Sequence, residues 1–422
     1  MQRIRLSNNL KIRKELFGCI VANLHTKEIK FYNADAYKLF KVLVIPSDFE
    51  NVLSLFEEGD RITAFDFINK LQNDGIVEST SESSQSISKF YFGDIEKFPK
   101  SYLFMPVGAE IEITLRCSRN CTYCCYESDP FVETNFELTI NQWALVFDKL
   151  VESGVFSLKF TGGDPLTRKD IMDILKIADD KGIIFTLGTD LTLLNQKHID
   201  SLLNFKHLLM VQTTLDGSYE KLADSQRGKG NFKKVLGGIE LMSKNNIPFS
   251  VVTVVHKENF ADIKNIAKLI SPFSPLGYAI GPLFPSGRAK GTNNIIPDEQ
   301  DLRIANRLFK ESVDEKIISS INPACDYFTE RYTEREIDNY RNTQVDTIHS
   351  PDEQLRINAT GNCYVSIKLK DILDESDFFV GNIMSESISD IWHSQKLNDL
   401  RNRATLKNHF GRYFMKKIKI VK

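Results

Sequence analysis

Between residues 108 and about 320, short apolar runs alternate with longer segments whose apolar residues recur every three or four positions. The first pattern predicts strands and the second predicts amphipathic helices. The expected strands are Glu110–Leu115, Val155–Thr161, Ile183–Gly188, Leu208–Leu215, Phe249–Val255 and Tyr278–Leu283. The expected helices include Thr139–Glu152, Arg168–Lys181, Gln196–Leu203, Phe232–Lys244 and Ala261–Ile270. Six strand–helix units predict an α/β fold, a partial (βα)6 barrel over residues 108–318, with functional loops at the C-terminal ends of its parallel strands.

Residues 1–80 show a different pattern, which predicts a separate winged-helix-like module. Alternation from Ile12 to Val21 and again over Glu28–Tyr32 predicts a short antiparallel sheet. Asn33 is the expected N-cap of a first helix, and Phe49–Phe56 is an expected second helix. A third helix over Ile62–Leu71 is expected to stop at the Asn73-Asp74-Gly75 signal. A polar linker is expected over residues 81–107, before the barrel.

The candidate chemistry concentrates in one stretch directly after the first barrel strand. Cys117, Cys121 and Cys124 lie within eight residues, close enough for three thiolates to ligate one metal centre from a single loop. No fourth ligand is supplied, and an open position is typical of catalytic rather than structural metal sites. Four of the seven cysteines fall between Cys117 and Cys125. In an intracellular chain this crowding indicates metal or redox chemistry rather than a disulfide framework.

Charge and hydropathy narrow the location and the partners. The formal net charge is -2, which gives no reason to expect bulk binding to nucleic acid or to an anionic membrane. The N-terminal stretch has no apolar core of a signal peptide, and no apolar run reaches the length needed to span a bilayer. A cytoplasmic protein is therefore predicted.

The cysteine spacing, with Tyr123 before the third cysteine, resembles the cluster loop of the radical S-adenosylmethionine (SAM) enzymes. Further stretches resemble motifs of the same family in the same order, namely Gly162-Gly163-Asp164-Pro165, Thr213-Thr214-Leu215-Asp216-Gly217 with Arg227, and Pro285-Ser286-Gly287-Arg288-Ala289. The resemblance covers about residues 108–290. It implies that Cys117, Cys121 and Cys124 hold a [4Fe-4S] cluster and that SAM completes the fourth iron. Reductive cleavage of SAM would then give a 5'-deoxyadenosyl radical that abstracts a substrate hydrogen.

The same resemblance implies roles for the residues that contact SAM. Asp164 would accept from the SAM ammonium, beside the two glycines, Thr214 would contact the ribose, and Arg227 would pair with the carboxylate. Read alone, Asp216-Gly217 is a simple turn and Arg227 a simple exposed cation. Gly188-Thr189-Asp190 departs from the Thr-Asn-Gly of many relatives and leaves Asp190 without a role. Cys125 is either a small buried filler or a hydrogen-atom donor or substitute ligand.

The N-terminal module is similar to the PqqD-like peptide-recognition domain of enzymes that modify ribosomal peptides. The similarity rests on Lys11–Gly18, Tyr32-Asn33, Leu71 and Gly75-Ile76. In that family a leader peptide adds a strand to the sheet edge beside the third helix. A purely structural cap and a DNA-binding winged helix are the alternatives. The third helix carries Asp66, Asn69 and Lys70, a poor basic face for DNA.

Residues 319–422 resemble the SPASM/twitch extension of peptide-modifying radical SAM enzymes, followed by a basic tail. The resemblance rests on the stretches 355–364, 381–383 and 388–392. Relatives bind extra clusters here through about seven cysteines, whereas this chain has only Cys325 and Cys363, with Ser366 where a further cysteine is usual. Two thiolates cannot supply four ligands, so the extension is expected to keep its shape without a cluster. The rival is one unusual cluster completed by another ligand.

Together these resemblances predict a radical SAM maturase of a ribosomal precursor peptide. The expected product is an intrapeptide cross-link, either a thioether or a carbon–carbon bond. The alternatives are a peptide epimerase that uses Cys125 as hydrogen donor, a maturase of a folded protein such as a sulfatase, and a cluster-bearing DNA-binding sensor. A flavodoxin or a ferredoxin is the expected electron donor.

Overall fold

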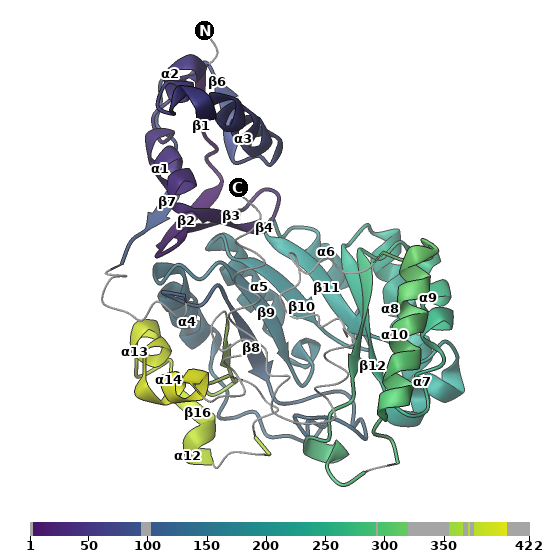
Figure 1. Ribbon diagram of the computed structural model, residues 1–422. Coiled ribbons are helices and arrows are strands. Elements are labelled where there is room, and N and C mark those ends of the chain that lie inside the picture. Colours follow the sequence, from purple (N-terminus) through teal and green to yellow (C-terminus); the bar gives the residue numbers. More distant parts are fainter. Residues whose placement is uncertain are drawn as a thin grey trace.

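The computed structural model describes residues 3–93, 103–292, 294–319, 354–365, 370–371 and 375–402. A small N-terminal module lies at one end of a larger α/β body, and the C-terminal region flanks the same body (Figure 1). No helix in these described stretches is long and apolar enough to cross a bilayer.

The larger body is the predicted partial barrel, and its elements follow the sequence pattern closely. Its parallel strands are β8 Gly108–Thr114, β9 Ser157–Gly162, β10 Ile184–Gly188, β11 Leu208–Thr214, β12 Phe249–Val255 and β13 Gly277–Pro282. Its helices are α4 Ile140–Glu152, α5 Ile171–Asp180, α6 Gln196–Leu202, α7 Glu220–Arg227, α8 Asn231–Lys244, α9 Ile263–Ile270 and α10 Glu299–Asp314. Helix α7 was not predicted, although it carries Arg227. The α/β fold class is confirmed.

The sheet continues beyond the barrel into the C-terminal region. Strand β14, Gln354–Ile357, pairs in parallel with β8, and β15, Asn362–Tyr364, and β16, Phe379–Asn382, follow it in antiparallel order. The described sheet therefore runs β13-β12-β11-β10-β9-β8-β14-β15-β16, and its two end strands do not pair with each other. The described C-terminal region also contains three short helices, α12 Glu375–Phe378, α13 Ile388–Trp392 and α14 Gln395–Asn402.

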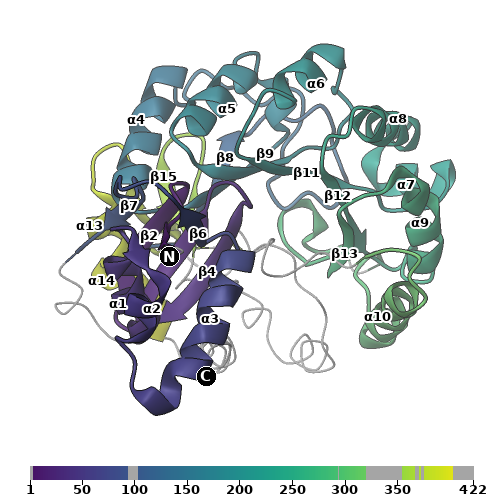
Figure 2. The ribbon, with the colours of Figure 1, turned by 90° about the horizontal axis from the view of Figure 1, so that it is seen from above.

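The helices cover only the outer face of the curved sheet, as the view from above shows (Figure 2). Because side chains alternate along a strand, Ile111 and Ile113 of β8 point outward and join the core with Trp143 and Phe147. The intervening residues of each strand point to the inner face. On β8 these are Glu110 and Glu112, so the barrel interior is polar at this strand.

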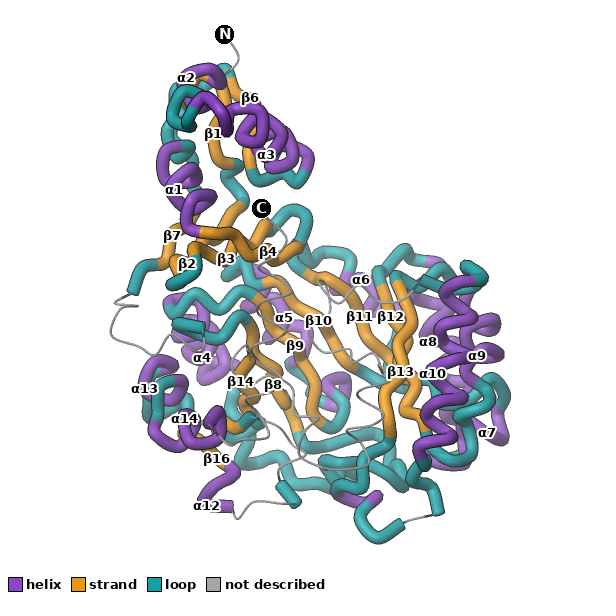
Figure 3. The backbone as a smooth tube through the Cα atoms, in the orientation of Figure 1, coloured by secondary structure: helices purple, strands orange, loops and turns teal. Residues whose placement is uncertain are grey.

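The N-terminal module has two small sheets and three helices (Figure 3). One sheet joins β1 Arg3–Leu6, β5 Ser47–Asp48 and β6 Val77–Thr80, and the other joins β2 Leu10–Glu15, β3 Gly18–Asn23, β4 Glu28–Asn33 and β7 Lys89–Tyr91. The helices are α1 Ala34–Val42, α2 Phe49–Leu53 and α3 Arg61–Asn73. Asn33 caps α1 by accepting from the amide of Ala36, and Gly75 takes φ +67° after α3, as predicted.

Part of the stretch expected as a linker belongs to this module. Strand β7 pairs in parallel with β2, at the edge opposite β4. Before it, the carbonyl of Ser84 accepts a hydrogen bond from Arg5 at 3.0 Å, and the hydroxyl of Ser88 donates to the carbonyl of Ser7 at 2.6 Å. The serine-rich composition did not predict these contacts, because serine-rich segments occur both as solvated loops and as segments that are hydrogen-bonded to neighbouring main chain.

The module is fixed to the barrel at the ends where the barrel strands begin. Ile20 and Ile29 of its four-stranded sheet pack with Phe156 and Ile184, which stand at the starts of β9 and β10. The ammonium group of Lys11 donates to the carbonyl of Gly182 at 2.6 Å, and that of Lys27 donates to the carbonyl of Leu208 at 2.7 Å. The module therefore lies at the opposite end of the strands from the cysteine loop.

Arg13 makes the most extensive of these contacts, and it gives a first prediction. Its guanidinium group is buried, pairs with Glu15 at 2.8 Å, and donates to the carbonyls of Met105, Pro106 and Gly154. Arg13→Met would leave the Glu15 carboxylate buried without its cation, so we expect the free energy of unfolding in urea to fall by roughly 3–5 kcal/mol. Lys14→Met, on the same strand, is the control and should change it by less than about 0.5 kcal/mol. Equal effects of the two substitutions would contradict the role given to Arg13.

Candidate active site

The cysteine loop leaves the C-terminal end of β8, as predicted. Cys117, Cys121, Cys124 and Cys125 are all free thiols, and each is partly exposed. The loop is shaped by main-chain bonds, among them the amide of Thr122 to the carbonyl of Gln226 at 3.0 Å. The described residues contain no group of three His, Cys, Asp or Glu side chains that could hold a single metal ion. A [4Fe-4S] cluster suits this loop better, because each thiolate then binds a different iron.

The Pro285–Ala289 motif braces the cysteine loop. Gly287 has φ +56°, and a Cβ atom there would lie 2.5 Å from the carbonyl oxygen of Cys124. Arg288 donates from Nε to the carbonyl of Cys121 at 2.7 Å and from Nη2 to that of Ser128 at 2.9 Å. The motif thus fixes the main chain that carries two of the three cysteines, and none of these bonds uses a cysteine side chain.

Gly162 and Gly163 are required by contact with the chain itself. Cβ atoms at these positions would lie 2.1 Å from the carbonyl oxygens of Thr114 and Arg116, respectively. The amide of Gly163 donates to the carbonyl of Thr114, and the amide of Asp164 donates to that of Arg116, both at 2.8 Å. This loop is therefore seated on the start of the cysteine loop, and Pro165 then begins a 3-10 turn, Pro165–Thr167.

The side chain of Asp164 organises the loop that follows β10. Its carboxylate is buried and accepts from the amide of Leu166, the hydroxyl of Thr189, both at 2.9 Å, and the amide of Asp190 at 3.3 Å. Burial and the neighbouring Asp190 raise the pKa of Asp164 well above its ordinary value. Contact with the SAM ammonium stays a prediction for this residue. Apart from Leu166, its partners are Thr189 and Asp190, and sequence reasoning left Asp190 without a role.

That loop also contacts the cysteine loop. The hydroxyls of Ser118 and Thr192 lie 2.8 Å apart, and Arg119 Nε lies 3.6 Å from the carboxylate of Asp190. Asp190 in turn accepts from the amide of Thr192 at 2.9 Å. The loops after β8, β9 and β10 therefore form one connected surface at the C-terminal end of the sheet.

Asp216 is the main addition that the structure makes to the predicted site. It is fully buried and accepts from the hydroxyl of Tyr123, from Nε of Arg227 and, at 2.9 Å, from the amide of Val254. The Arg227 guanidinium carbon lies 5.5 Å from the centre of the Tyr123 ring. Although burial lowers the pKa of Arg227, Asp216 raises it well above its ordinary value. The two Nη atoms of Arg227 have no hydrogen bond within the described structure and remain available to a carboxylate ligand.

Thr214 ends β11 and is half-buried, with no side-chain partner among the described residues. Its hydroxyl is free to donate to or accept from a ligand, as the predicted ribose contact requires. Asp216 thus holds Tyr123 and Arg227 together, and Thr214 lies two residues before Asp216 in the chain.

The inner face of β8 carries a second polar group that sequence reasoning missed. Glu110 pairs with Arg356 of β14, and the hydroxyl of Tyr126 donates to the Glu110 carboxylate at 3.3 Å. Glu112 is 2% exposed, and its Oε1 has no hydrogen-bond partner among the described residues. Parallel strands are usually apolar on both faces, so the Glu-Ile-Glu-Ile alternation was the available signal. Cys125 lies near these side chains, and burial raises its thiol pKa to about 12.

Glu112 gives a second prediction. Burial raises its pKa from 4.5 to about 8, even though Arg356 lowers it. The uncharged carboxyl therefore favours the fold below about pH 4.5, and this contribution is lost as the pH rises toward 8. Glu112→Gln has no carboxyl group to ionise, so its free energy of unfolding should not fall with pH in this way. The difference in unfolding free energy between Glu112→Gln and wild type should therefore grow in favour of the variant between pH 5.5 and 8, by at most about 1.4 kcal/mol per pH unit. Parallel stability profiles would contradict the burial of an uncompensated carboxyl, and the exposed Glu152→Gln is the control.

In the C-terminal region, Cys363 is fully buried in β15 and its Sγ lies 3.7 Å from the carbonyl oxygen of Gly361. It packs as a core residue, which was the expectation for this cysteine, and the loss of the clusters from the extension stays a prediction. Cys325, Ser366 and the basic tail after residue 402 lie outside the described residues.

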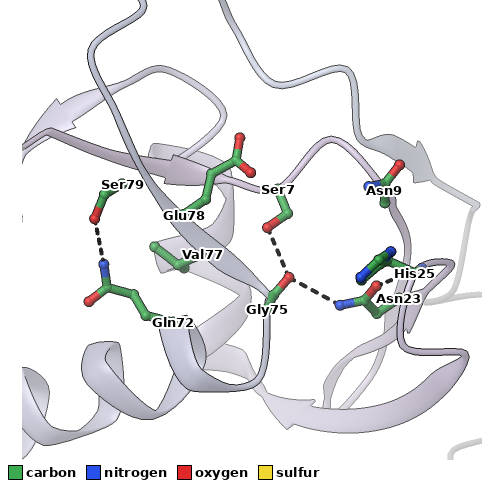
Figure 4. Close-up of a pocket in the computed structure, with 9 residues that line it drawn as sticks. All are labelled: Ser7, Asn9, Asn23, His25, Gln72, Gly75, Val77, Glu78 and Ser79. Carbon is green, nitrogen blue, oxygen red and sulfur yellow. Dashed lines mark hydrogen bonds between the residues drawn. The ribbon is translucent and has the colours of Figure 1, made fainter.

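The N-terminal module contains a polar pocket of about 410 Å³ at the C-terminal end of α3 (Figure 4). It is lined by Ser7, Asn9, Asn23, His25, Gln72, Gly75, Val77, Glu78 and Ser79. The carbonyl of Gly75 accepts from both Ser7 and Asn23, and Gln72 donates to Ser79 at 3.1 Å. The polar lining of the pocket suits a polar group held by the module.

Two family models match this chain. The radical SAM superfamily matches residues 111–270, and the SPASM iron–sulfur cluster-binding domain matches residues 349–412. The first range covers the cysteine loop and the loops after β9, β10 and β11, but not the Pro285–Ala289 motif. The second contains only one cysteine, Cys363.

Curated relatives and solved structures agree with these matches. An AdoMet-dependent heme synthase of Methanosarcina barkeri is 27% identical over 312 residues, 73% of this chain and 88% of that protein. A PqqA peptide cyclase of Bradyrhizobium diazoefficiens is 32% identical over 168 residues, 39% of this chain and 43% of that protein, so less than half of its length is matched. SuiB of Streptococcus suis, solved with its precursor peptide SuiA, has a TM-score of 0.67 at 15% identity and covers 96% of this chain and 91% of its own. At that identity, the likeness to SuiB concerns the fold.

Proposed function

We propose that this radical SAM enzyme modifies a ribosomally synthesised precursor peptide and forms a cross-link within it. Its cofactors are a [4Fe-4S] cluster and SAM, which together supply a radical able to abstract hydrogen from an unactivated C–H bond. Cys117, Cys121 and Cys124 are the residues that would hold the cluster. Thr214 and Arg227 would orient SAM, and Asp216 and Tyr123 would hold Arg227 in place.

The observation that carries the peptide proposal is the docked N-terminal module with an unpaired sheet edge. Strand β4 ends the described four-stranded sheet, so its outer edge offers main-chain donors and acceptors to an added strand. Lys30 of β4 forms an ion pair with Asp74 at the end of α3 at 3.1 Å, which places that helix end beside the edge. The whole-chain likeness to SuiB and the relationship to PqqA peptide cyclase support this reading.

The proposal is tested by binding the precursor peptide encoded nearest to this gene. We expect the full-length precursor to bind, and the same peptide without its leader to bind at least about tenfold more weakly, because main-chain pairing at β4 supplies the affinity. Duplex DNA at two salt concentrations is the control. Salt-sensitive duplex binding without peptide affinity would overturn the proposal in favour of a DNA-binding sensor.

Epimerisation is the second candidate, and one observation favours it. The Cys125 thiol remains protonated at neutral pH because burial raises its pKa to about 12, and a hydrogen-atom donor must keep its S–H hydrogen. The two reactions differ in mass: a cross-link removes two hydrogen atoms, whereas epimerisation in D2O incorporates one deuterium. Full product from Cys125→Ala would dispose of the donor role.

A further inference from the structure

Glu112 stands on the inner face of the barrel, two residues before the end of β8. Its neighbour across the sheet is Thr161 of β9, the residue before Gly162. It is therefore close to the loops that form the active site, yet none of the motif residues contacts it. One of its oxygens is buried without a hydrogen-bond partner in the described structure. The hydroxyl of Tyr126 lies within hydrogen-bonding reach of the Glu112 carboxyl group.

In the described structure, Glu112 forms no ion pair of its own with the cations that lie near it. Arg356 faces Glu110 across the β8–β14 pair and forms an ion pair with it. Tyr126 donates to Glu110 at 3.3 Å and also lies near Glu112. Lys159, which is next to Glu110 on β9, has a partner of its own. Lys370 also lies near Glu112, but its ammonium group pairs with Glu127 at 2.9 Å. Among the described residues, Arg356 and Lys370 are therefore each paired with a carboxylate other than Glu112.

We propose that Glu112 binds the cationic side chain of a lysine or arginine in the substrate, inside the barrel and next to the site of hydrogen abstraction. The inference rests on the proposed function only in that the ligand is taken to be a peptide. An ammonium or guanidinium group would supply the hydrogen-bond donor that the buried oxygen lacks, and it would balance the negative charge of the Glu112 carboxylate.

A cation fits this position better than a peptide carbonyl does. A neutral Glu112 could donate one hydrogen bond to a carbonyl, but a carbonyl would not balance the charge of the ionised carboxylate beside Glu110. A lysine ammonium has three donors and an arginine fork has five, enough to serve both oxygens. The group that enters the interior beside Glu112 is therefore expected to be positively charged.

The test uses two tripeptides that differ in a single charge, acetyl-Gly-Lys-Gly-amide and acetyl-Gly-norleucine-Gly-amide. Isothermal titration at pH 7 should show the lysine peptide binding at least about tenfold more tightly than its uncharged analogue. Glu112→Gln should remove this preference, and the surface variant Glu152→Gln should keep it. Equal or undetectable binding of the two peptides by the wild type would overturn the proposal, as would a preference that survives in Glu112→Gln.

The number of protons released on binding distinguishes a direct contact with Glu112 from a general structural effect of the Glu112→Gln substitution. Binding a cation should drive Glu112 to its charged form, so the lysine peptide should release protons at pH 7 from wild type and none from Glu112→Gln. The release is measured by repeating the titration in buffers of different ionisation enthalpy. No release from wild type would overturn the proposal. Since the tripeptides carry no leader and the assay needs no SAM cleavage, the result does not depend on leader binding or on the reaction type.

Discussion

Alanine at Cys117, Cys121 and Cys124 together is expected to abolish reductive cleavage of SAM and to remove the iron from the anaerobically reconstituted protein. Each thiolate would ligate a separate iron of the cluster. The loop should keep its course without the thiols, because Arg288 and Gly287 contact its main-chain carbonyls. The loss of iron would therefore report on ligation and not on unfolding.

Iron and sulfide analysis decides this prediction. Wild type should contain about four irons per chain, and the triple variant none. Cys125→Ala is the matched control and should retain its iron, because the neighbouring thiol is not one of the three expected ligands. About four irons surviving in the triple variant would mean that Cys325 and Cys363 hold a second cluster. That outcome would contradict the expected empty extension and would favour thioether chemistry.

Asp216→Asn is expected to lower both stability and SAM affinity. The substitution leaves Arg227 nearly buried without its counter-charge, so the free energy of unfolding without SAM should fall by roughly 3 kcal/mol. Arg227 would also lose the bond that aims its guanidinium group, so SAM should bind at least about tenfold more weakly. Tyr123→Phe removes only one hydroxyl bond to the same carboxylate and should cost about 1 kcal/mol.

A comparison of ligands separates positioning from general destabilisation. Wild type should discriminate strongly against decarboxylated SAM, because Arg227 would lose its carboxylate partner. In Asp216→Asn this discrimination should shrink, since the guanidinium group is no longer held in place. If both proteins discriminate equally, Asp216 does not position Arg227 for the SAM carboxylate.

Local patterns predicted most of the elements that bear the site. The alternation of strand and helix patterns located all six barrel strands, and parallel topology then implied that their C-terminal loops meet. Gly162 and Gly163 were identified only as part of a motif that resembles a SAM-binding motif, whereas the structure shows that the close approach excluding a side chain at each is to Thr114 and Arg116. A glycine in the sequence can indicate that another group passes close to the main chain, but it does not identify that group.

Long-range contacts account for what the sequence did not reveal. Asp216 looks like any turn aspartate until Tyr123 and Arg227, which are distant in sequence, converge on it. The pairing of β14 with β8 brings Arg356 to Glu110 across 246 positions, and no local pattern specifies that register. The buried role of Arg13 likewise depends on carbonyls about 90 and 141 residues away.

The position of the N-terminal module sets a minimum spacing for any precursor peptide that binds at its sheet edge, as proposed here. Its sheet packs where the barrel strands begin, whereas the cysteine loop leaves the end of the seven-residue strand β8. At about 3.3 Å per residue, the two ends are separated by roughly 23 Å. A precursor anchored at β4 must bridge at least that span, so some seven or more extended residues separate its recognition sequence from the residue that reacts. Substrate choice would then depend on spacing along the precursor as much as on the side chain that is modified.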